Sequence, residues 1–298
     1  MKDLDSCPVC HNANLAIAYS GKSLRVASED EIWTVAKCRN CQHGFLNPQP
    51  EWEDIEHYYD DSYGAYDTSH GSTEEDTDVV AKALKEGQFR HLKLPIKGKK
   101  ILDVGTGGGF FLRICSSLGA QVQGVEPSAV AAEIVREQGI EVFHGMLDDF
   151  DSEERFDIIT ANQVLEHTSD PVTTLAKMRS LLAEGGKIWI AVPNADCVWA
   201  KVLRSRWDGA DLPYHLMQFT PSSLEIAAKN AGLAVEDMRT ISVPWITRHS
   251  IRKTMREYLK MPTPVSGVLV PLSLATAIGK SMDRRCAGDN LIVEFQPA

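Results

Sequence analysis

The sequence predicts an α/β protein with a doubly wound, mostly parallel β-sheet and a small four-cysteine module at its N-terminus. Three observations carry this prediction: two Cys-x-x-Cys pairs in the first 41 residues, an alternation of apolar strands and amphipathic helices after residue 98, and a glycine-rich loop where the first of these strands ends. The chain has 298 residues, of which 43% are hydrophobic and 24% are charged, so it can bury a full core.

The chain is acidic, with 31 Lys and Arg against 41 Asp and Glu and a formal net charge of -10. Residues 1–97 alone carry 10 basic and 17 acidic side chains. Such a surface repels phosphates, so the composition disfavours a nucleic-acid partner. No apolar run reaches the roughly 18 residues of a membrane-spanning helix, and the first residues lack the apolar segment of a secretory signal. We therefore expect a cytoplasmic protein.

Four of the seven cysteines lie in the N-terminal four-cysteine module, which we expect to occupy residues 1–47. They form two pairs separated by 27 residues: Cys7, Cys10, Cys38 and Cys41. Two such pairs complete the tetrahedral thiolate site that Zn²⁺ prefers, and the residues around them alternate like strands at 15–19, 24–27 and 32–36. We predict a structural zinc ion in a zinc-ribbon-like fold. The alternatives are a redox dithiol, disfavoured without a βαβ context, and two disulfides, disfavoured in a reducing cytoplasm.

An acidic, tyrosine-rich linker is expected at residues 48–97, where prolines mark its start. Its tyrosines either line a pocket or pack with their hydroxyl groups in water. The linker should end in a lead-in helix at 77–94, because apolar residues recur there at helical spacing.

The core at 98–243 alternates strands with helices, which is typical of a parallel sheet that binds its ligand at the carboxyl ends of the strands. The expected strands are 100–104, 122–125, 141–143, 156–160 and 187–192, followed by 235–241 and 290–295. The expected helices are 110–118, 129–138, 171–182 and 221–230. Thr220 should cap the last of these, with Pro221 at its first position. Residues 244–298 would hold an insertion and the final strand.

The glycine-rich loop follows the first core strand. Its glycines, at 105, 107, 108 and 109, allow a sharp turn and a close approach to a ligand. Phe110 occupies the position of the third glycine of a dinucleotide-binding loop, which argues against that ligand class. Asp103 could instead brace the loop through its N–H groups and leave room for an amino-acid moiety. Glu126 ends the second strand, where a carboxylate can accept both hydroxyl groups of a ribose.

Three motifs together resemble the class I S-adenosylmethionine-dependent methyltransferases. They are D-V-G-T-G-G-G at 103–109, the acidic end of the second strand, and N-Q-V-L-E-H-T-S-D-P at 162–171. The resemblance runs from about residue 77 to residue 232, and it implies a Rossmann-like sheet and S-adenosylmethionine as the methyl donor. The four-cysteine module and the tyrosine-rich linker resemble a subgroup that methylates sugars, cell-surface glycans and secondary metabolites.

The resemblance also implies which residues bind the cofactor. Besides Asp103, these are Gly105, Thr106 and Gly107 at the methionine portion, Glu126 at the ribose, and Asn162 and Gln163 beside the sulfonium. Many relatives carry an acid that binds the adenine amino group after the glycine ending strand three. Here Gly145 is followed by Met146 and Leu147, so we expect adenine to rest on apolar side chains and a backbone N–H, with Asp148 as the alternative acid.

Two histidines are candidate catalytic bases. His167 follows the cofactor motif at 162–166, and His215 follows the fifth core strand, over the expected pocket mouth. A hydroxyl or carbon acceptor needs a base, whereas an amine needs only to be unprotonated. The acceptor atom therefore stays open among O, N and C, and each histidine could instead be a hydrogen-bonded structural residue.

The insertion reverses the charge of the chain, since residues 244–288 carry eight Lys and Arg against two acidic side chains. Arg248, Arg252 and Arg256 would share one face of a helix. That face could clamp a phosphorylated or nucleotide-linked substrate, or contact anionic lipid peripherally through residues 248–285, or simply be solvated.

These observations favour an enzyme that methylates a small molecule or glycan, most simply a sugar or sugar nucleotide. Two alternatives remain. One is an RNA methyltransferase that uses the four-cysteine module to hold RNA, which the net negative charge of the module and its linker together, residues 1–97, disfavours. The other is a non-catalytic zinc-dependent scaffold, which the intact glycine loop disfavours. The sequence carries no signal for the oligomeric state.

Overall fold

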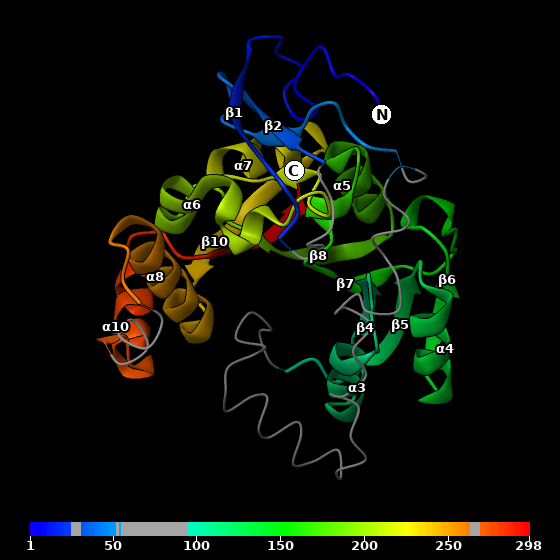
Figure 1. Cartoon of the computed structure of the whole chain (residues 1–298). Helices are drawn as coiled ribbons and strands as arrows, with labels where there is room; N and C mark the ends of the chain where they lie inside the picture. Colours follow the sequence, from blue (N-terminus) through cyan, green and yellow to red (C-terminus); the bar gives the residue numbers. More distant parts are fainter. Residues whose placement is uncertain (25–30, 52–53, 55–94, 263–268) are drawn as a thin grey trace.

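A computed structural model describes residues 1–24, 31–51, 54, 95–262 and 269–298. Its main body is a seven-stranded sheet of order β10-β11-β8-β7-β4-β5-β6, and a four-stranded sheet of order β1-β2-β3-β9 lies beyond one of its faces (Figure 1). The lead-in helix expected at 77–94 and nearly all of the tyrosine-rich linker lie outside the described residues.

Five neighbouring strands of the main sheet are parallel. They are β6 (Glu141–His144), β5 (Gln121–Glu126), β4 (Lys100–Val104), β7 (Phe156–Asn162) and β8 (Leu182–Pro193). β11 (Asn290–Pro297) then pairs antiparallel with β8, and β10 (Leu233–Ile241) pairs antiparallel with β11. The mostly parallel, Rossmann-like sheet is thus confirmed. The carboxyl ends of the parallel strands meet at one edge, which is where a ligand of such a sheet binds.

Helices cover both faces of this sheet. α3 (Phe110–Ser117) and α4 (Ala129–Glu137) lie on one face, and α5 (Pro171–Ser180) and α7 (Pro221–Asn230) lie on the other (Figure 1). Three of these helices have a side-chain N-cap. Ser128 caps α4, Asp170 caps α5, and Thr220 forms a capping box with Ser223 at α7. The predicted cap at Thr220 is therefore confirmed.

The small sheet joins the N-terminal segment to the core. β1 (Leu15–Gly21), β2 (Trp33–Cys38) and β3 (Gly44–Leu46) come from the four-cysteine module, whereas β9 (Met217–Gln218) comes from the segment after His215. One hydrophobic cluster contains Trp33 and Phe45 of the module together with strand residues of the main sheet. The small sheet therefore crosses the boundary expected near residue 47.

Two helices of the insertion, α8 (Pro244–Tyr258) and α10 (Leu272–Asp283), pack against each other beside β10. α6 (Val198–Leu203) and two 3-10 turns, η6 (Arg204–Arg206) and η7 (Asp208–Ala210), connect β8 to the loop before β9. Among the described residues, no helix combines the length and the apolar character that crossing a membrane would require.

Candidate active site

The glycine loop joins β4 to α3 at the carboxyl edge of the main sheet. Gly105, Gly107 and Gly109 all have positive φ angles, of 70°, 54° and 79°, which glycine adopts without strain. Among the described residues, no side chain caps the N-terminus of α3, and a Cβ atom added at Gly108 would meet nothing within 4 Å. A helix N-terminus with unpaired N–H groups attracts a carboxylate, so the loop fits the amino-acid end of S-adenosylmethionine.

Glu126 ties this loop to the next strand. Its Oε2 atom accepts a hydrogen bond from the N–H of Gly107 at 2.7 Å, and its Oε1 atom accepts one from the N–H of Ser128 at 2.9 Å. The side chain is nearly buried, and this burial raises the pKa of the carboxyl group despite the two bonds. Each carboxylate oxygen keeps a second lone pair, so a ribose hydroxyl could still bind there.

The sequence predicted that Asp103 accepts hydrogen bonds from the N–H groups of the glycine loop, but its partner in the structure is a side chain of the neighbouring strand. Its Oδ1 atom accepts a hydrogen bond from the hydroxyl of Thr160 on β7 at 2.5 Å. The N–H groups of Gly105 and Thr106 donate to the carbonyl of Val125 instead. Asp103 therefore links β4 to β7 rather than bracing the loop. Burial and the neighbouring charge of Glu126 raise the pKa of Asp103 to about 7.

The remaining expected cofactor residues lie at the ends of the two flanking strands. After β6, Met146 is 60% exposed whereas Leu147 is buried at the start of the 3-10 turn η4 (Leu147–Asp149). At the end of β7, Asn162 and Gln163 are both exposed, and Gln163 has a φ of 57°. The carboxyl edge thus presents side chains from both flanks of the glycine loop.

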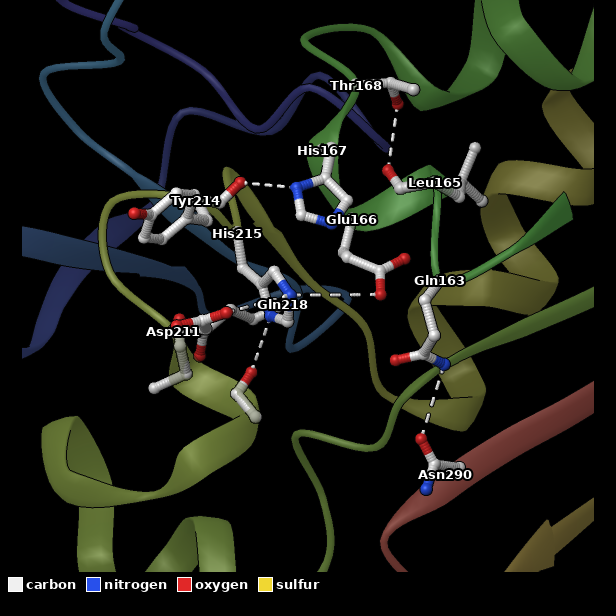
Figure 2. Close-up of polar contacts among 12 residues, drawn as sticks. Gln163, Leu165, Glu166, His167, Thr168, Asp211, Tyr214, His215, Gln218 and Asn290 are labelled. Atoms are coloured by element: carbon white, nitrogen blue, oxygen red, sulfur yellow. Dashed lines mark hydrogen bonds and ion pairs between the residues drawn. The ribbon is translucent and has the colours of Figure 1, made fainter. Parts of the chain in front are cut away.

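The two candidate bases lie against each other although they come from different loops. His167 ends the 3-10 turn η5 (Leu165–His167), and its ring centre lies 4.8 Å from that of His215 in an edge-on arrangement. His167 Nδ1 donates to the carbonyl of Tyr214 at 2.8 Å, and His215 Nδ1 donates to the carbonyl of Gly209 at 2.9 Å (Figure 2). Since carbonyls only accept, both neutral rings carry their lone pair at Nε2.

Among the described residues, two carboxyl groups face the Nε2 atom of His215. Glu166 Oε1 lies 4.0 Å from it and Asp211 Oδ2 lies 3.8 Å from it (Figure 2). Both acids are nearly buried, with exposures of 1% and 5%. Burial and the charge of Asp211 raise the pKa of Glu166 to about 8. The described part of the site therefore brings together two imidazoles and two buried acids.

The four cysteines of the N-terminal module converge on one point. Their sulfur atoms all lie within 4.8 Å of one another, with Cys7 and Cys41 3.5 Å apart and Cys10 and Cys38 3.6 Å apart. Four sulfurs arranged tetrahedrally at about 2.3 Å from one ion would lie roughly 3.8 Å apart. The residue after each pair, His11 or Gln42, has a φ near 60°, so both pairs form the same kind of turn. The donors thus fit a zinc ion.

Side chains reinforce the junction between the module and the core. Tyr19 donates its hydroxyl proton to Gln218 Oε1 at 2.5 Å, and Asn230 donates to the carbonyl of Val9 at 2.7 Å. His43 is fully buried between Met217 and Ser223, and burial lowers its pKa to about 3, so this ring is neutral at physiological pH. These contacts hold the segment after His215 against the four-cysteine module.

Sequence reasoning missed several of these partners. Asp211 and Gly209 contact His215 from its own loop, and Thr160 and Gln218 reach across strands. The four-residue spacing of Asp211 and His215 was the only signal in the sequence. The contacts of Thr160 and Gln218 join residues that are far apart in the sequence, so the spacing of residues along the chain could not predict them.

A family model described as a methyltransferase domain matches residues 78–237, more than half of the chain. The ubiquinone biosynthesis O-methyltransferase of Xanthomonas euvesicatoria pv. vesicatoria is 30% identical over 176 residues, which cover 54% of this chain and 74% of that protein. The enzyme of the same name from Stutzerimonas stutzeri is 27% identical over 173 residues, covering 52% and 73%.

Two solved structures show the same fold at low sequence identity. The [4+2]-cyclase SpnF has a TM-score of 0.52 and 17% identity, and the match covers 84% of this chain and 97% of the cyclase. A methyltransferase from Mesorhizobium loti that depends on S-adenosylmethionine has a TM-score of 0.50 and 16% identity, covering 72% and 99%. With the glycine loop, Glu126 and the sheet order in place, the chain belongs to the methyltransferase-domain family and is an S-adenosylmethionine-dependent methyltransferase.

Proposed function

We propose that this enzyme methylates a hydroxyl group of a small molecule, most simply a sugar, a sugar nucleotide or a glycan, with His215 as the general base. The observation that carries the proposal is the bond from His215 Nδ1 to the carbonyl of Gly209, which places the basic lone pair of the neutral ring on Nε2. The sequence relatives carry O-methyltransferase in their names, which supports oxygen as the acceptor atom. A hydroxyl group, unlike an amine, needs a base when it attacks.

Residues at the carboxyl edge would hold the cofactor. Gly105, Thr106 and Gly107 would face its methionine portion, Glu126 its ribose, Met146 and Leu147 its adenine, and Asn162 and Gln163 its sulfonium. When bound, S-adenosylmethionine supplies an electrophilic methyl group on a neutral leaving group. The protein then has to align the acceptor, exclude water and remove one proton.

His215 would remove that proton. Its Nδ1–H bond to Gly209 fixes the tautomer and the ring orientation, so that Nε2 points into the buried cluster. His167 is held in the same way by Tyr214 and would line the acceptor site beside it. His215 is assigned as the base because Glu166 and Asp211 both face its Nε2 atom.

A basic groove on α8 supports a phosphorylated or nucleotide-linked acceptor. The cavity there has a volume of about 520 Å³, and its lining includes the cations Lys253, Arg256 and Lys260 together with His249 and one acid, Glu257. Lys253 and His249 both contact Asp208, next to the residue whose carbonyl holds His215. A diphosphate in this groove would therefore lie near the loop of the base.

The four-cysteine module would bind zinc through Cys7, Cys10, Cys38 and Cys41. The matched turns and the sulfur distances support this assignment. The ion would be structural, since all four donors are protein thiolates and leave no open position. Its effect would reach the core through the β3–β9 pairing.

A cofactor-turnover screen tests the proposal. Release of S-adenosylhomocysteine should rise with a nucleotide sugar or a lipid-linked glycan and stay at background with tRNA and rRNA. A catechol belongs in the same screen, because the relatives are named for ubiquinone biosynthesis and a phenolic hydroxyl is the second candidate acceptor.

Variants of the enzyme then test the residues. His215→Gln should lower kcat by about 100-fold or more with the acceptor found, whereas His144→Gln at the end of β6 should not. Full turnover by His215→Gln would rule out this base. The Arg256→Ala, Lys260→Ala double variant should raise KM for a nucleotide sugar but not for the free sugar, with Arg136→Ala on α4 as the control. If the double variant changed KM equally for the nucleotide sugar and the free sugar, the groove would have no role in binding phosphate.

A further inference from the structure

Glu166 carries a buried carboxyl group that the described fold does not use. Its side chain is 1% exposed, and neither oxygen has a hydrogen-bond partner in another described residue. Burying a carboxyl group without such a partner costs free energy. The side chains around the Glu166 carboxyl group therefore indicate its role.

Within the part of the chain that the structure describes, the titratable groups around Glu166 come from two elements. From η5 itself comes His167, and from the loop that leads to β9 come Asp211 and His215. One donor atom each from Glu166, His167 and His215 lie within 4.8 Å of one another. Of these groups, His215 Nε2 is the one for which the structure gives an ion-pair distance to Glu166, 4.0 Å.

We propose that Glu166 is a positioning residue whose carboxylate stabilises the imidazolium of His215 after that ring has taken the proton of the acceptor hydroxyl. The inference rests on the proposed role of His215 as the base. In the step, the O–H bond breaks and an N–H bond forms at Nε2. The O–CH₃ bond forms as the S–CH₃ bond breaks, and the electron pair of that bond stays on sulfur.

In the active form of the pair, which has lost its shared proton, the Glu166 carboxylate faces a neutral ring. The positive charge of the sulfonium disappears in the same step in which the positive charge of the imidazolium appears. Glu166 gains its cationic partner only then, so the attraction is stronger after proton transfer than before it. An interaction of this kind lowers the barrier instead of merely tightening binding.

The pair also determines a pH dependence. A carboxylate at this distance from Nε2 favours the protonated imidazole over the neutral one. Asp211 faces the same Nε2 atom and acts in the same direction. The pair must lose its shared proton before His215 can act as a base, so activity should rise with pH through the apparent pKa of the pair.

A titration tests the pair without any acceptor. The ring C–H signal of His215 is followed by NMR in the full-length protein and assigned by its loss in His215→Gln. In Glu166→Gln the pKa of His215 should fall by about one unit, and in Glu166→Asp most of the fall should be recovered. An unchanged His215 pKa in a folded Glu166→Gln variant would overturn the proposal. So would a shift of the His215 signal on addition of magnesium chloride, because Glu166 would then bind a cation.

Kinetics test the consequence with the acceptor found in the screen. Glu166→Gln should lower kcat about 10- to 100-fold at unchanged acceptor KM, and the acidic limb of its pH profile should move to lower pH. Glu133→Gln, an exposed acid on α4, serves as the control. If His215→Gln keeps full activity, the proposed base fails while the titration result still stands. The pKa of His215 could fall in Glu166→Gln while kcat and the acidic limb of the pH–activity profile stay as in the natural enzyme. That result would refute the role of Glu166 in the reaction.

Discussion

Gly44 of β3 pairs with Gln218 of β9, three residues after His215, so the proposed base and the four-cysteine module are joined by one sheet. The pairing leaves little room for change, because a Cβ atom at Gly44 would come within 3.2 Å of the Gln218 side chain. The loop of His215 thus depends on an N-terminal module that lies more than 170 residues away along the chain. The first two predictions follow from this dependence.

Loss of one cysteine of the module should destabilise the whole protein. Cys38→Ser removes a thiolate that is buried at the end of β2, and with it the zinc ion that we propose there. We expect the free energy of unfolding to fall by several kcal/mol, roughly a 10 °C fall in Tm, together with a loss of bound zinc. Thermal unfolding and elemental analysis measure both. Cys286→Ser, at an exposed cysteine, is the matched control. A Cys38→Ser variant that keeps its Tm would show that the module needs no metal.

The Tyr19 hydroxyl should matter more than a neighbouring hydroxyl on the same strand. Tyr19→Phe leaves Gln218 Oε1 without its donor at the junction, which should cost about 1–2 kcal/mol. Ser20→Ala removes an exposed bond to Thr34 and should cost less than about 0.5 kcal/mol. Denaturant unfolding of the two variants compares them directly. If both variants lost the same free energy of unfolding, the hydrogen bond from Tyr19 to Gln218 would not stabilise the position of β9.

Glu126 should control the affinity for the cofactor. Glu126→Gln keeps the shape of the side chain but removes the charge that accepts the Gly107 and Ser128 N–H bonds. Loss of a charged acceptor costs about 1.5–3 kcal/mol, so calorimetry should find S-adenosylmethionine bound about 10- to 100-fold more weakly. Glu137→Gln on α4 should bind normally. Unaltered affinity in Glu126→Gln would remove this residue from the cofactor site.

The sequence predicted the main sheet well because each of its strands shows its own local apolar pattern. β4 and the glycine loop follow from residues 100–109 alone. The site was less predictable, because its contacts join distant segments. β9 has only two residues, too few for any periodicity, and it becomes a strand only by pairing with β3. Glu166 and His215 are each visible in the sequence, but their approach depends on how η5 and the loop after α6 pack together.

Asp289 should give stability a pH dependence that a single substitution removes. The carboxyl group lies buried before β11, where Oδ2 accepts a bond from Thr247 and Oδ1 has no partner among the described residues. Burial raises its pKa to about 7, with smaller contributions from the charges of Asp283 and Asp208. The folded state therefore holds this proton when the unfolded chain, with a pKa near 3.9, has already released it. Stability from this group is complete below about pH 4 and is lost as the pH rises towards 7.

Asp289→Asn cannot lose a proton, so its stability relative to the natural protein should increase between pH 4 and pH 7 and stay constant above. The increase is at most about 4 kcal/mol, since each unit of pKa shift is worth about 1.4 kcal/mol. Denaturant unfolding at a series of pH values measures the difference. Asp151→Asn, at an exposed acid, should show no such trend. A difference between Asp289→Asn and the natural protein that stays flat from pH 4 to pH 8 would mean that Asp289 is ionised throughout this range, with its charge compensated inside the fold.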